Sequence, residues 1–164
     1  PTELSDDYTA TTSVIAHAIE WQQLHGETPS AVCCIYATAP FVRAVDLLQG
    51  FNMLNKLGCD YVFSVTSYAF PIQRAIKLNK EGRVEMFQSE CFNTRSQDLE
   101  ESYHDAGQFY WGRPEAWLVG KPVFSADSAP IILPRYRVQD IDTLEDWVRA
   151  ELLLKIMEAE LISG

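Results

Sequence analysis

Two runs, Ala-Val-Cys-Cys-Ile-Tyr at residues 31–36 and Tyr-Val-Phe-Ser-Val-Thr at residues 61–66, decide the fold class of this chain. Short, continuous apolar runs are typical of strands that are covered on both faces. The segment between them, residues 42–57, has a helical spacing of apolar side chains and stops before Gly58. A strand, a helix and a second strand in this order form a βαβ unit. We therefore predict an α/β fold whose sheet is at least partly parallel.

The rest of the chain extends this unit without an internal repeat, a low-complexity tract or an obvious linker. Its length of 164 residues suits one domain with a real core, and we predict a single domain over residues 1–164. The other predicted elements are helices over residues 12–24, 112–120 and 143–162, a hairpin over residues 73–88 and a strand over residues 131–135.

The charge and composition limit the partners. The net charge is −10 and the isoelectric point is about 4.6, so nucleic acid, whose binders are normally basic, is not an expected partner. We expect no membrane span, because no apolar run is long enough, and we find no signal-peptide pattern at the start. The cysteines lack zinc-ligand spacing, and we interpret them as reduced residues of a cytoplasmic protein. They are Cys33, Cys34, Cys59 and Cys91.

Two carboxylates, Asp140 and Asp142, stand in the run Gln-Asp-Ile-Asp-Thr just before the last predicted helix. Alternate side chains of an extended backbone point the same way, so these two can converge on one Mg²⁺ or Mn²⁺ ion. The run can instead cap the helix, through Asp142 with Glu145 or through Thr143 with Asp146. Both interpretations stay open from spacing alone, and they are compatible because Asp140 is free in either case.

The loops after the two buried runs are the expected place for a ligand, because ligands of parallel sheets bind beyond the carboxyl ends of the strands. One such loop begins at Ala37 and the other at Ser67. We expect Thr38 and Ala39 of the first loop to line the ligand cleft, with a plain strand-to-helix turn as the alternative.

Three stretches combine into a resemblance to a known family. They are Ala-Thr-Ala-Pro-Phe at residues 37–41, the stretch at residues 94–111 that ends in Tyr-His-Asp-Ala-Gly-Gln-Phe-Tyr-Trp, and Asp-Ile-Asp-Thr at residues 140–143. Their order and spacing resemble the acylneuraminate cytidylyltransferases over nearly the whole chain. The Ala-Gly pair within the second stretch resembles the branch that acts on pseudaminic acid.

The resemblance implies a three-layer, Rossmann-like nucleotide-diphospho-sugar transferase fold with a mainly parallel sheet. A hairpin-containing insertion over residues 70–112 would support a homodimer. The implied reaction joins CMP from CTP to an acidic nine-carbon sugar, with pseudaminic acid favoured, and releases pyrophosphate. In this reaction Asp140 and Asp142 would hold Mg²⁺ or Mn²⁺ beside the α-phosphate of CTP.

The resemblance also implies residues that contact the substrates. Arg95 would bind the sugar carboxylate or a phosphate, because the planar guanidinium suits both, and a surface salt bridge is the alternative. Aromatic side chains would form a wall for the apolar side of the sugar, although core packing or a dimer contact would explain them equally. The further predicted substrate-binding residues are Arg74, Gln97, Tyr103, Phe109 and Tyr110.

One departure from the family matters. Its members begin with a strand and a loop rich in Gly, Lys and Arg that holds the triphosphate of CTP, and this chain starts downstream of that loop. We therefore expect a fragment of a longer protein. A chain that truly ended at Pro1 would bind CTP poorly and could have an exposed sheet edge. The alternatives are a cytidylyltransferase for sialic acid or another nonulosonic acid, a non-catalytic remnant that acts as a binding or assembly subunit, and a metal-dependent hydrolase.

Overall fold

A central sheet organises the described part of the chain, in the strand order β1–β5–β2–β6. The computed structural model describes the backbone of residues 1–163 and the side chains of residues 1–158. Strands β1 (Val32–Ile35), β2 (Tyr61–Ser67) and β6 (Ser128–Ile132) run in one direction, while β5 (Tyr103–Gly112) runs in the opposite direction between β1 and β2. The α/β class and the shared direction of the two strands of the βαβ unit are confirmed.

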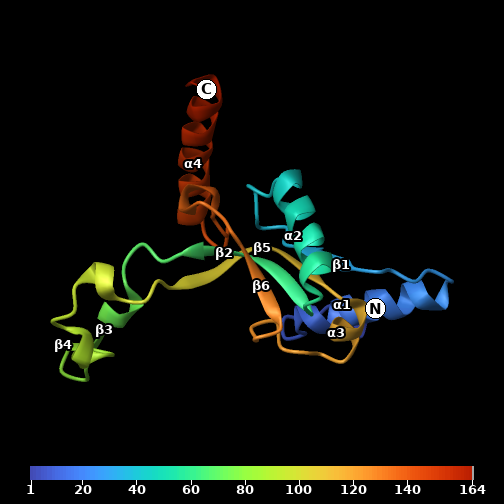
Figure 1. Cartoon of the computed structure of the whole chain (residues 1–164), viewed down its shortest axis with the longest axis horizontal. Coiled ribbons are helices and arrows are strands. Elements are labelled where there is room, and N and C mark those ends of the chain that lie inside the picture. The colour runs from blue at the N-terminus through green and yellow to red at the C-terminus, as the bar shows by residue number, and fades with distance from the viewer. Residues whose placement is uncertain (164) are drawn as a thin grey trace.

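Helices cover both faces of the sheet, which gives three layers (Figure 1). They are α1 (Thr11–Leu24), α2 (Ala44–Leu57) and α3 (Pro114–Leu118). On one face Ile19 of α1 and Trp117 of α3 pack around Tyr61 and Tyr110. On the other face Leu54 of α2 is fully buried against the sheet. Burial of these side chains away from water is the main term that holds the layers together.

Helix α2 lies unusually close to β5, and a glycine allows it. A Cβ atom on Gly50 would lie 2.8 Å from Cδ1 of Trp111, which is closer than two carbon atoms can pack. The indole N–H of Trp111 donates a hydrogen bond of 2.9 Å to the carbonyl of Leu47. The helix ends at Gly58, whose φ of +67° is the left-handed conformation that glycine adopts without strain.

The last helix, α4 (Leu144–Ser163), rises away from the sheet (Figure 1). Its start is fixed by a reciprocal cap, in which the N–H of Asp146 donates to Oγ1 of Thr143 at 3.2 Å and the N–H of Thr143 donates to Oδ2 of Asp146 at 3.0 Å. Of the capping pairs that the sequence left open, the structure has Thr143 with Asp146. The carboxylates of Asp140 and Asp142 are thus left for another role.

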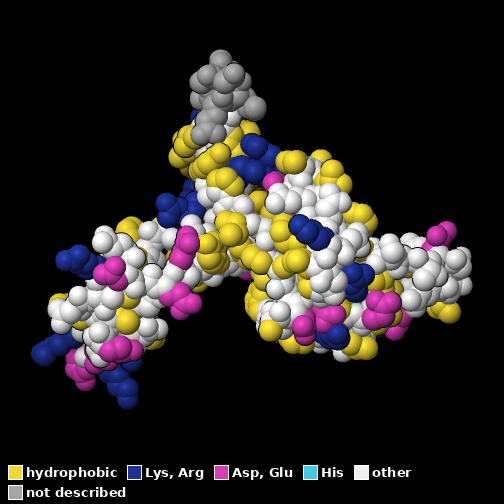
Figure 2. All heavy atoms as spheres, viewed as in Figure 1, with side chains coloured by type: hydrophobic (Ala, Val, Ile, Leu, Met, Phe, Trp, Pro, Cys, Tyr) yellow, Lys and Arg dark blue, Asp and Glu magenta, His cyan; other side chains and the backbone are white. Residues whose placement is uncertain are grey.

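The residues between β2 and β5 in the chain form an arm. The arm extends from the sheet on the side opposite to α1 (Figures 1 and 2). It contains the predicted hairpin, whose strands β3 (Ile76–Leu78) and β4 (Val84–Met86) are antiparallel. The predicted insertion over residues 70–112 is too long at its end, since β5 belongs to the core sheet. Short 3-10 helices at Ile72–Arg74, Ser89–Cys91 and Ser96–Asp98 complete the arm, and others lie at Thr2–Leu4 and Arg135–Arg137.

The helices differ in length and polarity, and none in the described part of the chain is both long and apolar enough to cross a membrane.

Candidate active site

A cleft of about 580 Å³ lies at one edge of the core sheet. Tyr36, Ser67 and Arg135, which line it, stand at or just beyond the carboxyl ends of β1, β2 and β6. Because β5 runs the other way, it brings its first residues, including Asp105, to the same edge. The cleft therefore occupies the position where open α/β sheets bind ligands.

A bulge in β5 shapes the floor of the cleft. The pairing between β2 and β5 shifts between Phe63 and Val65, and Gly107 takes a φ of +62° there. The backbone N–H of Phe109 donates a hydrogen bond of 3.2 Å to the hydroxyl oxygen of Ser64. This N–H group therefore has a partner although the bulge interrupts the strand pairing. Bulges of this kind are frequent beside active sites because they redirect side chains.

Asp105 is held by the bulge at the inner wall of the cleft. Its Oδ1 accepts the backbone N–H of Gly107 at 2.9 Å, and its Oδ2 accepts the hydroxyl of Tyr110. Burial, helped by the adjacent carboxylate, raises the pKa of Tyr110 far above its usual value. The phenol therefore stays protonated and remains a hydrogen-bond donor to Asp105. Sequence reasoning assigned no role to Asp105, because its partners come from the bulge.

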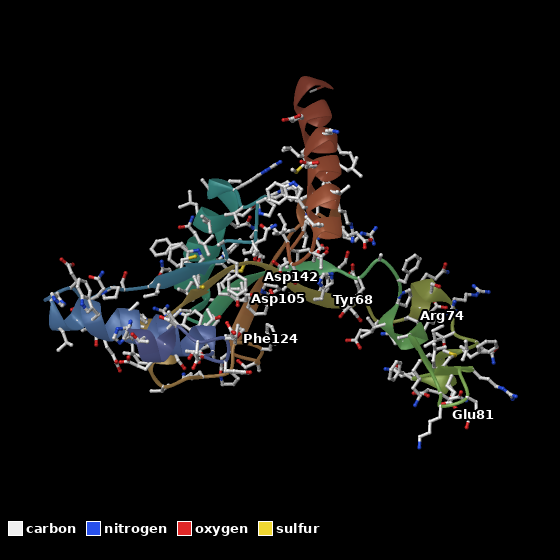
Figure 3. The ribbon with its side chains drawn as sticks, turned by 180° about the vertical axis from the view of Figure 1, so that it is seen from behind. Tyr68, Arg74, Glu81, Asp105, Phe124 and Asp142 are labelled. Carbon is white, nitrogen blue, oxygen red and sulfur yellow. The ribbon has the colours of Figure 1, made fainter. Side chains whose placement is uncertain are left out.

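The predicted carboxylates Asp140 and Asp142 both line this cleft and both are exposed to solvent. Oδ2 of Asp140 lies 3.5 Å from the position that a Cβ atom would take on Gly107. Figure 3 places Asp142 and Asp105 near the junction of the sheet with α4, where the cleft opens. The structure thus brings the Asp-x-Asp pair and the bulge together, although they are far apart in the sequence.

These carboxylates fit a divalent cation that takes its other ligands from water and substrate. No cluster of three or more His, Cys, Asp or Glu side chains in the described residues could enclose a metal by itself. Mg²⁺ commonly uses one or two carboxylates together with phosphate oxygens and water. The exposed pair Asp140 and Asp142 has the hard oxygen donors and the open side that such binding requires.

Two arginines that the sequence reasoning did not select also line the cleft, Arg135 and Arg149. Nη1 of Arg135 donates to the carbonyl of Tyr68 at 3.3 Å, at the base of the arm. Both had a signal in the sequence. Arg135 is the last residue of the predicted strand over residues 131–135, and Arg149 stands in the second turn of the predicted helix that follows Asp142.

Three predicted substrate contacts lie in the arm and not in this cleft. Arg74 donates to the carbonyl of Thr94 inside the arm, and Arg95 is exposed there. Gln97 lines a separate hollow of about 270 Å³. Figure 3 shows Arg74 on the arm, away from Asp142. Within one copy of the chain these residues do not meet the Asp-x-Asp pair.

The predicted aromatic wall divides between the cleft and the core. Tyr110 lines the cleft, with its ring centroid 5.1 Å from that of Tyr36. Phe109 points to the other face of the sheet and is fully buried under α2, as the core alternative required. Tyr103 is 40% exposed at the start of β5.

The predicted loop residues Thr38 and Ala39 are not among the residues that line the 580 Å³ cleft. Ala39 is buried, and its N–H donates to the carbonyl of Tyr36 at 3.3 Å. This geometry matches the alternative of a strand-to-helix turn, with Tyr36, the residue before the loop, facing the cleft.

We assign none of the cysteines a role as a nucleophile in this site. All four are free and half-buried, and burial raises the pKa of Cys33 to about 12. The thiol of Cys33 is therefore protonated at neutral pH and acts as a small apolar residue.

Comparison with known proteins places the fold first. The solved structure of CMP:2-keto-3-deoxy-manno-octonic acid synthetase, in complex with CTP, superimposes with a TM-score of 0.50 over 91% of this chain and 70% of its own, at 12% sequence identity. No family model matches the chain. At this identity the likeness concerns the fold, and the chain has the Rossmann-like fold of a nucleotide-sugar synthetase.

Sequence relatives then give the family. The chain is 41% identical over 153 residues to the pseudaminic acid cytidylyltransferase of Campylobacter jejuni serotype O:2, and 40% identical to that of serotype O:23/36. A Helicobacter pylori protein, named pseudaminic acid cytidylyltransferase and UDP-2,4-diacetamido-2,4,6-trideoxy-β-L-altropyranose hydrolase, is 36% identical over 142 residues, which are 86% of this chain and 27% of that protein. The chain belongs to the family of these cytidylyltransferases. It spans 66% of the length of the two Campylobacter relatives, and the match covers 93% of the chain.

Proposed function

We propose that this chain forms the acceptor-sugar and metal-binding part of a cytidylyltransferase, which joins CMP from CTP to a nonulosonic acid and releases pyrophosphate. The observation that carries the proposal is the cleft at the strand ends, where Asp140 and Asp142 stand with Arg135 and Arg149. Carboxylates for a cation and guanidinium groups for anions are what two negatively charged substrates require. The family relationship supports the same reaction.

The chain's own residues would contribute positioning and charge. Asp140 and Asp142 would hold Mg²⁺, or Mn²⁺, which when bound supplies positive charge to the phosphates of CTP. Arg135 and Arg149 would orient the sugar carboxylate or phosphate oxygens through bidentate hydrogen bonds. Nucleotidyl transfer needs little covalent help from a protein, so fixed groups of this kind are the main requirement.

Both Campylobacter relatives are named for pseudaminic acid, and we propose this sugar as the acceptor. The name of the Helicobacter relative pairs the transferase with hydrolysis of a diacetamido sugar nucleotide, which supports an acceptor that carries acylamino groups. A second hollow, of about 210 Å³ and largely apolar, shares Tyr36, Asp105 and Tyr110 with the cleft. An acylamino group can place its amide at these polar atoms and its methyl group in such a hollow. A cytidylyltransferase for sialic acid remains the alternative, because sialic acid is also acylated.

The arm would join two copies of the chain. Its apolar side chains are exposed without a core beneath them, and an isolated two-stranded hairpin is only marginally stable in water. They are Phe70, Ile76, Leu78, Val84, Phe87 and Phe92. In a homodimer the arm of one copy could bring Arg74, Arg95 and Gln97 to the cleft of the other.

Pyrophosphate release by the complete gene product tests this function. With CTP, Mg²⁺ and a panel of nonulosonic acids, we expect release to depend on the sugar and to be fastest with pseudaminic acid. Sugar binding without release would favour the non-catalytic remnant. Phosphate release without any acceptor sugar would favour the hydrolase. Sedimentation of the wild type beside Leu78→Asp, with Leu24→Asp on α1 as the matched control, tests the dimer.

A further inference from the structure

A buried ion pair includes Arg137, which stands in the chain between the cleft-lining residues Arg135 and Val138. The guanidinium of Arg137 donates to Oδ2 of Asp46 on α2, and each residue is only 7% exposed. The other ion pairs of the described residues, Lys77 with Glu85 and Lys121 with Asp60, each include a side chain that is about half exposed. A charge pair taken out of water pays a desolvation cost that its mutual attraction often fails to recover.

The backbone around this pair leads to the predicted metal ligand. Nε2 of Gln108, a fully buried residue of β5, donates to the carbonyl of Arg137 at 2.5 Å. Nε2 of Gln139 donates to the carbonyl of Asp140 at 2.7 Å and to Oδ1 of Asp146 at 3.0 Å. The segment that runs from β6 to α4 is therefore anchored from α2, from β5 and from the cap of α4.

Two of the side chains that hold this segment, Arg137 and Gln108, each have a buried polar atom without a hydrogen-bond partner. Nε of Arg137 and Oε1 of Gln108 have no hydrogen-bond partner although both are buried. An unpaired buried polar atom costs free energy, so folding stability alone does not favour this arrangement over apolar packing. Local features that cost stability in a folded protein are most often found at functional sites.

We propose that Asp46 and Arg137 are positioning residues for the reaction. Their ion pair holds the segment over residues 135–140 so that the exposed carboxylate of Asp140 and the guanidinium of Arg135 face the cleft. The proposal rests on the proposed function for the role of Asp140. It predicts that the pair can be removed with little change in stability but with a loss of catalysis, because the segment loses its directional anchor.

The test uses the complete gene product and the double variant Asp46→Leu/Arg137→Met, which replaces both charges with apolar groups. We expect a thermal midpoint within about 4 °C of the wild type. We also expect kcat to fall on the order of tenfold to a hundredfold, because small misplacements of reacting groups are costly. The Mg²⁺ concentration for half-maximal rate and the Kd of Mn²⁺, measured with CTP but without sugar, should both rise. The matched control, Asp60→Asn/Lys121→Met, removes an ion pair far from the cleft and should keep the wild-type kcat.

The possible results distinguish failure of the positioning role from failure of the proposed function. A folded double variant with wild-type kcat and wild-type Mn²⁺ binding overturns the proposal. If the double variant does not fold, Arg137→Lys keeps the charge but loses the fork, and unchanged kcat and Mn²⁺ binding in that variant also overturn it. If the wild type releases no pyrophosphate with any sugar, the proposed function fails, while the Mn²⁺ measurement still tests whether the ion pair positions Asp140.

Discussion

The core sheet and the arm both contain strands with apolar side chains, but these side chains are buried in the core and exposed in the arm. In the core, Tyr61, Val62 and Phe109 are fully buried between helices. In the arm, Ile76, Leu78 and Val84 are more than half exposed, although they occupy strands just as apolar. A strand's composition therefore predicts the strand but not what covers it. Helices of the core cover Tyr61, Val62 and Phe109, whereas the side chains of the arm are available to a second molecule.

The largest expected effect concerns the metal site proposed for the core. Asp142→Asn removes a carboxylate charge from the cleft and keeps the shape of the side chain, so kcat for pyrophosphate release should fall on the order of a hundredfold to a thousandfold. Asp127→Asn, at an exposed position outside the cleft, is the matched control and should be neutral. Turnover near the wild-type rate in Asp142→Asn would remove the metal assignment.

Stability should distinguish the two regions most directly. Leu54→Ala in the core deletes a fully buried side chain and should lower the free energy of unfolding by about 2–5 kcal/mol. Leu78→Ala in the arm removes a side chain that is 70% exposed, so its effect at low protein concentration should stay within about 0.5 kcal/mol. Denaturant titration measures both. An equal loss in the two variants would mean that the arm is covered even in a single copy.

The proposed anionic substrates offer a way to compare an arginine of the cleft with one of the arm. Arg135→Met should lower kcat/KM about tenfold to a hundredfold, since a hydrogen bond to a charged group is lost. Arg95→Met should matter only if the arm reaches the cleft of a second copy. Separate KM values for the sugar and for CTP show which anion each arginine binds. Arg83→Met in the hairpin is the control, and an Arg135 variant with wild-type KM values would contradict the assignment.

The smallest expected effect is a pH dependence at the start of α4. The hydroxyl of Thr143, with nearby backbone N–H groups, lowers the pKa of Asp146 below its ordinary value. A lowered pKa in the folded state stabilises the protein above the ordinary pKa of the group, and this contribution is lost as the pH falls through the folded value. Asp146→Asn should therefore lower the thermal midpoint at pH 7, with a difference that shrinks toward pH 3. A difference that does not change with pH would exclude the charge of Asp146 as its source.

Sequence patterns were sufficient to predict those features whose geometry depends only on residues near one another in the chain. The apolar runs at residues 31–36 and 61–66 predicted β1 and β2, and helical spacing predicted α1, α2 and α4. The two-residue spacing of Asp140 and Asp142 placed both carboxylates in one cleft. The position of β5 was harder to predict, because its polar Gln108 is buried against partners that come from residues far along the chain.

The candidate site shows the same limit. Arg74 follows β2 in the sequence and Arg95 and Gln97 precede β5, yet the arm carries all three away from the cleft. Arg135 and Arg149 enter the cleft because a strand end and a helical face converge there. Such convergence depends on tertiary contacts, such as the bulge at Gly107 and the ion pair of Asp46 with Arg137.

By itself the sequence determined the α/β class, the βαβ unit, the hairpin and the acidic pair before the last helix, because these follow from the spacing of residues near one another in the chain. Only the tertiary structure decided that an antiparallel strand separates β1 from β2, that Thr143 and Asp146 form the cap, and which charged side chains share the cleft. The physical reason is that burial and ion pairing act between groups that come together only when the chain has folded.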